Sequence, residues 1–425
     1  MSPSVSAEVS ATLAVNEAVA RLRASGREVV HLGFGEAGLP VLPEVAEVLS
    51  DAARLNSYGP VAGQWSTRAA VAGWFTRRGI DTRPEQIIVA PGSKAILFAL
   101  IAALSTAARP LVLPQVAWVS YAAQARFLGR RTILAPVPAE AGGLAEPDGL
   151  RRVLAQAGGS GWPAAAILFT LPDNPTGTMP SARLVEQNLA IAREHGLAVI
   201  SDEIYADTRH TDEPFTSPAA LYPERTVVTS GLSKSMALGG YRIGFARLPA
   251  NDWGDQLMRE LSATASELWS SLALPMQAVL AHVAAGPPSV VRYQRAAAAL
   301  HAAVAQAVSQ VFTARGATCR PPQAAFYIYP SFAAHRRQLA RKGILTSADL
   351  ARALLDGNGI ATLPGSCFGD QPEALTLRVA TSMLYGGDDE QRWAALASPA
   401  PTALEWIAAD LGRIADGLDA LLDGP

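Results

Sequence analysis

Short apolar runs that alternate with longer helical stretches constrain the fold of this chain more than any other feature. The runs are mostly apolar and only a few residues long, whereas an intervening stretch such as 181–195 repeats its apolar residues at helical spacing. Apolar strands separated by helices form a mostly parallel sheet that is covered on both faces. We predict an α/β fold with strands at residues 29–32, 86–90, 111–113, 132–135, 165–170, 197–200, 226–229 and 242–246.

The pattern changes near residue 290, where an alanine-rich helical segment (290–315) leads into a mixture of strand-like and helical stretches. Such a mixture is typical of a smaller α+β unit. We predict an N-terminal arm (1–42) that joins this smaller unit, a large domain (43–288) and a small C-terminal domain (289–425).

Both ends of the chain are predicted to be helical. Gly26 is expected to end the first helix, because glycine is common just beyond helix C-termini. The last helix spans 402–422, and Thr402 with Glu405 is expected to form a capping box at its start.

The composition excludes several classes of protein. The chain has 35 basic and 37 acidic residues, which argues against a general binder of nucleic acids or anionic membranes. Its two cysteines, Cys319 and Cys367, provide neither a disulfide framework nor a zinc site, and we expect no metal. We find no apolar stretch of membrane-spanning length and no signal peptide, and therefore expect a soluble, cytoplasmic protein.

Lysine is rare: of the 35 basic residues, only Lys94, Lys234 and Lys342 are lysines. A primary amine forms a Schiff base with a carbonyl compound, and a guanidinium does not. Lys234 follows a predicted strand in a Ser/Gly turn, and Arg242 lies eight residues further on. This pair would suit a cofactor that carries both a carbonyl and a phosphate, although a surface lysine is the alternative.

More polar residues follow directly after predicted strands. Asp202 and Tyr205 come after the run that ends at residue 200, and Asn174 follows the run that ends at residue 170. A buried carboxylate there would favour a cationic ring nitrogen beside it. Taken singly, a solvated acid and an ordinary turn explain these residues equally well.

Three further positions can also be interpreted either as functional or as ordinary structural features. Ser93 and Lys94 open a helix after a glycine turn, where free backbone N–H groups would bind a phosphate. Trp118 is either a core residue or a platform for a heterocycle. Arg378 lies in an apolar run and needs a carboxylate partner, either internal or bound.

Taken together, these motifs resemble the class I and II aminotransferases, which are fold-type-I pyridoxal-phosphate (PLP) enzymes. The resemblance spans about residues 8–385 and is nearest to the bacterial aspartate aminotransferase subgroup. Its motifs occur in the family's order: YGPVAGQWSTRAAVAGWF, IIVAPGSKAILFAL, WVSY, LPDNPTGT, SDEIYAD, GLSKSMALGGYRIGF, AFYIYP and LRVATS. The resemblance implies a seven-stranded sheet, a smaller domain and a homodimer with shared active sites.

The resemblance also implies the catalytic and cofactor-binding roles. Lys234 would form the internal aldimine with the cofactor and then act as general base for the proton shift, while the cofactor serves as electron sink. Asp202 would pair with the pyridinium nitrogen. Asn174 and Tyr205 would hydrogen-bond the ring 3-oxygen, and Trp118 would stack on the ring.

The remaining implied roles concern the phosphate and the substrate. The backbone amides of Ser93 and Lys94, with Arg242, would hold the phosphate, which Tyr58 would reach from the neighbouring subunit. Arg378 would clamp the substrate α-carboxylate. The pocket around that carboxylate would also be lined by Gly35, Trp118 and Asn174.

The substrate is expected to be acidic. In the aspartate aminotransferase subgroup, residues that correspond to Ser10, Thr12 and Lys94 recognise a distal carboxylate. We expect aspartate or glutamate, with 2-oxoglutarate or oxaloacetate as the acceptor.

The sequence departs from the family at two places of interest. GEAGLP stands where GEPDF is usual, and Gly231 stands where many relatives have a phosphate-binding serine. The first departure favours an alternative: a specialised biosynthetic enzyme, either a transaminase for an aromatic or modified amino acid or a lyase or oxidase on the same fold.

Overall fold

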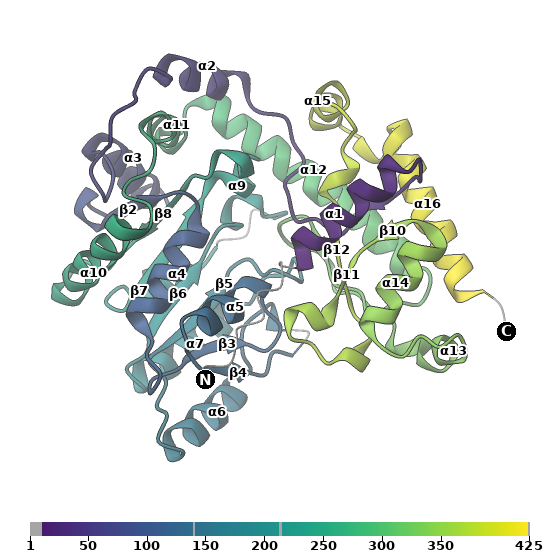
Figure 1. Ribbon diagram of the computed structural model, residues 1–425, viewed down its shortest axis with the longest axis horizontal. Coiled ribbons are helices and arrows are strands. Elements are labelled where there is room, and N and C mark those ends of the chain that lie inside the picture. The colour runs from purple at the N-terminus through teal and green to yellow at the C-terminus, as the bar shows by residue number, and fades with distance from the viewer. Residues whose placement is uncertain (1–10, 139–140, 212–214, 424–425) are drawn as a thin grey trace.

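The computed structural model describes residues 11–138, 141–211 and 215–423 as two lobes (Figure 1). The larger lobe is built around a long twisted sheet, and the smaller lobe carries the first and last described helices, α1 and α16. The helices are α1 (Ala11–Ala24), α2 (Pro43–Ala52), α3 (Trp65–Thr76), α4 (Ser93–Leu104), α5 (Val119–Phe127), α6 (Pro147–Gly159), α7 (Ala182–Glu194), α8 (Pro218–Leu221), α9 (Leu232–Ser235), α10 (Asp252–Leu268), α11 (Leu274–Ala285), α12 (Pro288–Thr313), α13 (Arg336–Arg341), α14 (Ser347–Asn358), α15 (Asp389–Ala397) and α16 (Glu405–Leu422).

The large sheet has seven strands in the order β2-β8-β7-β6-β5-β3-β4. All its neighbouring pairs are parallel except those that β8 makes with β2 and β7. The predicted α/β fold with a mostly parallel seven-stranded sheet is therefore confirmed. Its strands are β2 (Ile87–Ala90), β3 (Leu111–Pro114), β4 (Thr132–Ala135), β5 (Ala166–Thr170), β6 (Ala198–Asp202), β7 (Thr226–Gly231) and β8 (Gly244–Arg247).

Alternation along each strand divides the sheet's side chains between two cores. Ile88, for example, packs in one cluster with apolar residues of α4, α5 and α10. Its neighbours Ile87 and Val89 pack in another cluster, together with residues of α3, α11 and α12. Because both faces are covered, every residue of β2, β3, β5, β6, β7 and β8 is buried, as the apolar runs predicted.

The smaller lobe joins segments that are far apart in the sequence. β1 (Val30–His31) pairs in parallel with β10 (Ile360–Ala361), so the N-terminal arm is part of this lobe. A three-stranded sheet has the order β11-β12-β9. Its strands are β9 (Tyr327–Ile328), β11 (Leu363–Pro364) and β12 (Leu377–Ala380). The domain boundaries at 42/43 and 288/289 stay a prediction.

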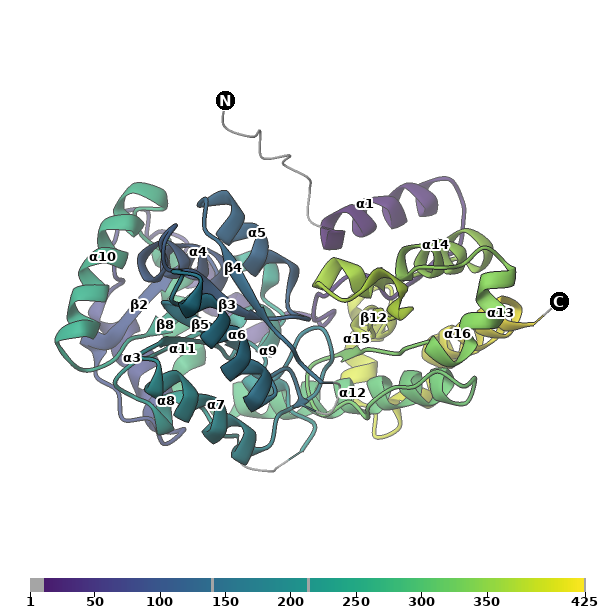
Figure 2. The same cartoon turned by 90° about the horizontal axis from the view of Figure 1, so that it is seen from below.

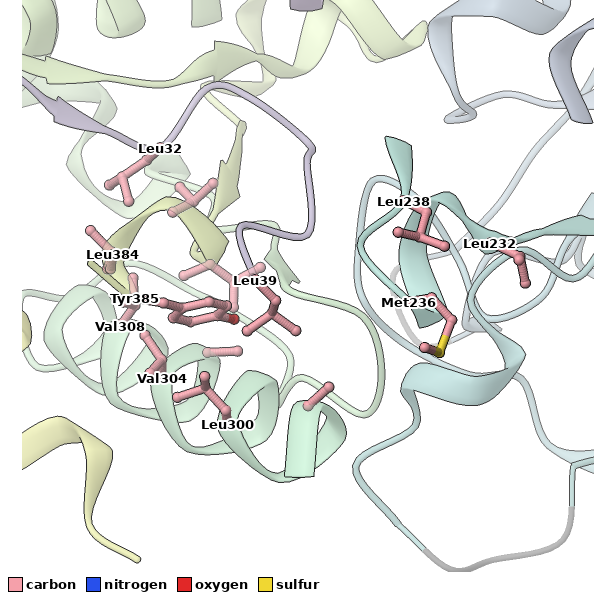
Figure 3. Close-up of a cluster of buried hydrophobic side chains, with 14 of the residues drawn as sticks. Leu32, Leu39, Leu232, Met236, Leu238, Leu300, Val304, Val308, Leu384 and Tyr385 are labelled. Carbon is pink, nitrogen blue, oxygen red and sulfur yellow. The ribbon is translucent and has the colours of Figure 1, made fainter. Parts of the chain in front are cut away.

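Helix α12 runs between the two lobes (Figure 2). Figure 3 shows Leu300, Val304 and Val308 of this helix pointing into a core that also contains Leu39 and Tyr385. By length and hydropathy alone α12 would be able to cross a membrane, so our expectation that no stretch reaches that length was wrong. Ala297 and Ala305 pack inside the protein with larger apolar residues of this helix, whereas its other alanines are half-buried or exposed.

The helix ends confirm one expectation and correct another. Gly26 follows α1 with a φ of 82°, in the left-handed region that favours glycine. The capping box of Thr402 and Glu405 does not form. Residues 401–403 form a short 3₁₀ turn instead, so Leu404 is the N-cap of α16 and Thr402 lies too early to cap it.

Candidate active site

A cavity of about 530 Å³ opens at the carboxyl ends of β5, β6 and β7, where the two lobes meet. With one exception, every predicted site residue whose side chain the structure describes lines it: Gly35, Ser93, Lys94, Trp118, Asn174, Asp202, Tyr205, Lys234, Arg242 and Arg378. The exception is Tyr58, whose side chain is 90% exposed on the surface of this subunit. Asn174, Asp202 and Lys234 converge because the strands that precede them end at one edge of the large sheet, whereas Arg378 comes from β12 of the smaller lobe.

Lys234 projects into the cavity from the short helix that follows β7. Its Nζ donates a hydrogen bond to the carbonyl oxygen of Gly35. Burial, reinforced by the positive charge of Arg378, lowers its pKa to about 8. A substantial fraction of this amine is therefore neutral near physiological pH, as a nucleophile or proton acceptor must be.

Gly231, at the end of β7, is required by close packing. A Cβ at this position would lie 2.5 Å from the carbonyl oxygen of Ile243 on the neighbouring strand. A serine therefore does not fit here unless the backbone shifts, and Lys234 follows a turn packed directly against β8.

Asp202 is a buried carboxylate at the end of β6. Its Oδ2 accepts a hydrogen bond of 2.8 Å from the Tyr121 hydroxyl, and its Oδ1 accepts one of 3.2 Å from Thr229. Burial raises its pKa to about 6, and the hydroxyl donors oppose this shift only in part. Within the described residues Asp202 has no ion-pair partner, so a cationic ring nitrogen would complete the site.

A chain of polar groups lies next to Asp202. Asn174 Nδ2 donates to the Tyr205 hydroxyl at 3.3 Å, and that hydroxyl lies 2.9 Å from the hydroxyl of Tyr327. All three residues are buried, and Asn174 Oδ1 has no partner among the described residues. A buried polar atom without a partner is costly, so this one indicates a ligand group.

The N-terminus of α4 and Arg242 form a cradle suited to an anion. Gly92 precedes α4 with a φ of 90°, and a Cβ there would lie 2.3 Å from Arg242 Nη2. Glycine thus allows the guanidinium to approach the first turn of α4, where Ser93 and Lys94 provide backbone N–H groups. A helix N-terminus beside a guanidinium is a typical phosphate site.

Lys94 and Trp118 lie together on another wall. Lys94 Nζ is 5.0 Å from the centre of the Trp118 ring, which itself meets Tyr121 edge-on. Burial, with a contribution from Arg242, lowers the pKa of Lys94. Of the predicted partners of Lys94, Ser10 and the side chain of Thr12 lie outside the described part of the chain.

Arg378 is a buried cation on β12 without a carboxylate partner. It is 1% exposed, its Nη2 donates to the Gly33 carbonyl at 2.6 Å, and its Nε has no acceptor among the described residues. Its guanidinium lies about 5 Å from the rings of Tyr327 and Phe368. The described residues provide no internal ion pair, which was one interpretation of the sequence, and the N–H groups of Arg378 that Gly33 does not engage would be available to a carboxylate in the cavity.

Several cavity residues were missed by the sequence reasoning. Tyr121 and Tyr327 belong to the motifs WVSY and AFYIYP, but their hydroxyls were given no role. Thr229, which donates to Asp202 without lining the cavity, was assigned only to a strand. Glu36 lines the cavity from the GEAGLP loop, whose sequence differs from that of the family. This difference was the only feature of the sequence that could have pointed to Glu36.

The fold and this site define a fold-type-I, PLP-dependent transaminase. The buried amine, the unpaired Asp202, the open Asn174 Oδ1 and the anion cradle together fit the aldehyde, ring and phosphate of that cofactor. The chain belongs to the aminotransferase class I and II family, whose sequence model matches residues 27–384.

Similar proteins carry related names. The chain is 28% identical to the aspartate aminotransferase of Geobacillus stearothermophilus, over 88% of this chain and 92% of that protein. It is also 28% identical to the aspartate/prephenate aminotransferase of Cereibacter sphaeroides, over 85% of this chain and 90% of that protein. The solved structure of Thermus thermophilus aspartate aminotransferase with maleate superposes with a TM-score of 0.82 at 25% identity, covering 96% of this chain and 97% of that chain.

The raised pKa of Asp202 leads to a stability prediction for the cofactor-free protein. A carboxyl whose pKa rises from 3.8 to about 6 on folding stabilises the fold at low pH, and this contribution is lost as the pH rises through that range. Asp202→Asn removes the buried charge. We expect it to stabilise the cofactor-free protein at pH 7.5 by about 2 kcal/mol, and to change its stability little at pH 4.

The measurement is the thermal unfolding midpoint at both pH values, with and without added cofactor. With cofactor the order should reverse at pH 7.5, because Asp202 then has its cationic partner and asparagine does not. A cofactor-free variant that is less stable than the wild type at pH 7.5 would contradict this account of Asp202.

Proposed function

We propose that this transaminase acts on aspartate or glutamate and a 2-oxo acid, in the cavity that joins Lys234 to Arg378. The observation that carries the proposal is a buried arginine fork without a carboxylate partner, in the same cavity as a buried amine of lowered pKa. Arg378 would bind the substrate carboxylate, and Lys234 would act at the α-carbon next to that carboxylate.

The cofactor would be held by residues along the whole cavity. Arg242 and the first backbone N–H groups of α4 would bind its phosphate, and Trp118 would lie against its ring. Asp202 would face the ring nitrogen, and Asn174 with Tyr205 would face the ring oxygen. When bound, PLP supplies an electron sink that stabilises negative charge at the substrate α-carbon.

The chain's own groups would then position the substrate and move the proton. Arg378 orients the α-carboxylate, and the close approach of Tyr327 to Gly35 shapes the pocket around it. Lys234 Nζ takes the proton from the substrate α-carbon and would return it two bonds away, to the carbon on the other side of the amino nitrogen. A pKa of about 8 suits this two-way transfer, because the amine accepts and donates a proton near neutral pH.

We propose a homodimer in which Tyr58 completes the partner's phosphate site. Tyr58 is 90% exposed, and Leu55 and Trp65 near it in sequence are 46% and 57% exposed. Large apolar side chains that are this exposed and close in sequence favour an interface. We also propose the division into an arm (1–42), a large domain (43–288) and a small domain (289–425).

Lys94 would select acidic substrates by pairing with their distal carboxylate. We expect Lys94→Ala to lower kcat/KM for aspartate and glutamate by about 10- to 100-fold, the effect of losing one charge-assisted hydrogen bond. For alanine and phenylalanine the loss should stay below about threefold, and Lys94→Arg should retain most activity toward acids. An equal loss for all four amino acids would contradict the selective role.

The test of the proposed function is the visible spectrum of the purified holoenzyme while single amino acids are added. A yellow protein that bleaches with aspartate or glutamate, and recovers with 2-oxoglutarate, would support the proposal. Bleaching only with an aromatic or modified amino acid would refute the acidic substrate. Altered bands without reversible bleaching would favour a lyase or oxidase on this fold.

A further inference from the structure

A second cavity lies outside the active site and shares no residue with it. It has a volume of about 980 Å³ and lies between the end of α3, the turn after β6 and the first half of α12. The turn is a short 3₁₀ helix, η3 (Ala206–Thr208), which follows Tyr205 directly. We call this cavity the arginine groove, after the four arginines that line it: Arg77, Arg78, Arg209 and Arg295.

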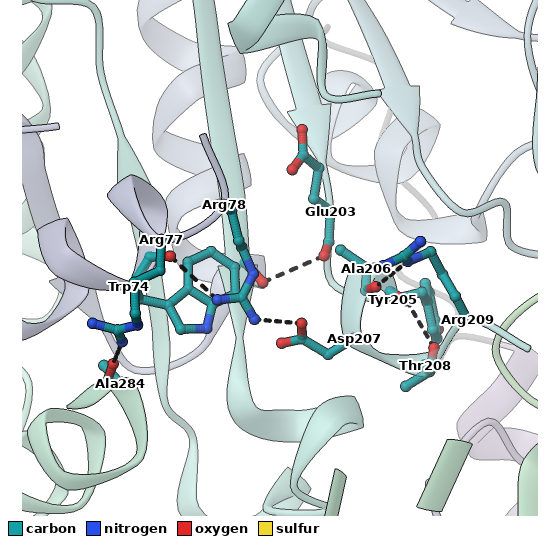
Figure 4. Close-up of polar contacts among 11 residues, drawn as sticks. Trp74, Arg77, Arg78, Glu203, Tyr205, Ala206, Asp207, Thr208, Arg209 and Ala284 are labelled. Atoms are coloured by element: carbon teal, nitrogen blue, oxygen red, sulfur yellow. Dashed lines mark hydrogen bonds and ion pairs between the residues drawn. The ribbon is translucent and has the colours of Figure 1, made fainter. Parts of the chain in front are cut away.

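The arginines of the groove differ in their partners (Figure 4). Arg78 stacks on the Trp74 ring at 3.5 Å and forms a 2.5 Å ion pair with Asp207, the one acidic residue among the described residues that line the groove. Arg77 donates to the carbonyl oxygen of Ala284 and has no acidic partner within the described chain. Arg209 donates to the carbonyl oxygen of Ala206 and lies over the Phe215 ring.

Arg295 is the most available of these cations. It is exposed on α12 and lines the groove, and among the described residues it makes no hydrogen bond, ion pair or ring contact. The other titratable group of the lining, His210, adds no compensating charge. Its ring contacts two backbone carbonyls, and burial lowers its pKa, so it is neutral at pH 7. Within the part of the chain that the structure describes, Arg77 and Arg295 thus have positive charges without an acidic partner in one cavity.

We infer that the arginine groove binds a small anion with two negative charges, of the phosphate or dicarboxylate type. A guanidinium binds planar oxyanions through paired N–H groups, and two of them on different walls favour a ligand with two charged oxygens. The chain as a whole has a net charge of −2, so this concentration of positive charge is local to the groove.

The experiment is a calorimetric titration of the cofactor-loaded enzyme at low ionic strength, with inorganic phosphate and, separately, succinate. The variant is Arg295→Ala, which removes a side chain without contacts and should leave the fold intact. The matched control is Arg292→Ala, because Arg292 is an exposed arginine on the same helix that does not line the groove. Succinate also suits the substrate site, so only the part of its binding that Arg295→Ala removes is attributed to the groove.

We expect saturable binding that Arg295→Ala weakens at least fivefold and that Arg292→Ala changes less than twofold. Loss of phosphate binding would assign the groove to phosphorylated ligands, and loss of succinate binding alone would assign it to dicarboxylates. The inference would be overturned if the wild type showed no saturable phosphate binding and Arg295→Ala removed no part of the succinate binding. Equal weakening by both variants would do the same, because it would reveal a general charge effect.

Discussion

Lys234→Arg is expected to lower the rate of transamination by roughly 10³-fold or more. Loss of a general base alone typically lowers a rate by about 10²- to 10⁴-fold. The guanidinium keeps the positive charge and much of the volume, but it neither bonds to an aldehyde nor exchanges a proton near neutral pH. The measurement is the single-turnover rate with a saturating amino donor. A second measurement is the mass of the chain after borohydride reduction, which links the cofactor covalently to the lysine of the wild-type chain.

The matched control is Lys342→Arg. Lys342 ends α13 in the smaller lobe, far from the cavity, where its Nζ donates to the carbonyl oxygen of Leu421 at 2.9 Å. This variant should keep the wild-type rate and the reduced cofactor adduct. If Lys234→Arg still carried the adduct, or turned over at a similar rate, another amine would be the reacting group and the site would be wrongly assigned.

Arg378→Lys is expected to lower kcat/KM for every amino acid by about 10²- to 10³-fold. In the proposed site the buried guanidinium would bind the carboxylate through two parallel hydrogen bonds, and the amine of a shorter lysine side chain would supply at most one. The loss should be general, in contrast to that of Lys94→Ala, because all amino acids share the α-carboxylate. The measurement is the half-reaction rate across acidic and neutral donors.

Two controls separate binding from folding in this experiment. Arg247→Lys changes another buried arginine, on β8, which contacts Thr82 and the Asp81 carbonyl and does not line the cavity. It should lower the thermal midpoint and leave kcat/KM of the folded protein near the wild type. An amine without an α-carboxylate should react equally slowly with the wild type and Arg378→Lys; a large difference would mean that Arg378 acts on more than the carboxylate.

The fold was predictable because its signals are local. Each apolar run became a strand within about two residues of its expected position, since a strand buried on both faces must be apolar throughout. Residues at strand ends, such as Asp202 and Asn174, were predictable for a related reason: the topology of a parallel sheet brings those ends together.

What the sequence did not reveal depends on contacts between distant segments. Whether Arg378 had an internal partner depended on which side chains surround β12, and no local pattern records this. The hydroxyl of Tyr327 reaches the site only because the smaller lobe packs against the end of β6. The arginine groove is similar, because Arg77 and Arg295 are more than 200 residues apart and line one cavity only because the turn η3 packs against α12.

The pairing of β1 with β10 has a consequence for how the chain folds. Val30 pairs with Ile360, so more than 300 further residues must be synthesised before the first strand has its neighbour. Closing so long a loop is slow, whereas the strands of the large sheet find partners nearer in sequence. We expect the ribosome-bound chain to complete the large sheet first. The substrate-clamping Arg378 would then arrive last, so that a truncated product is unable to acquire activity.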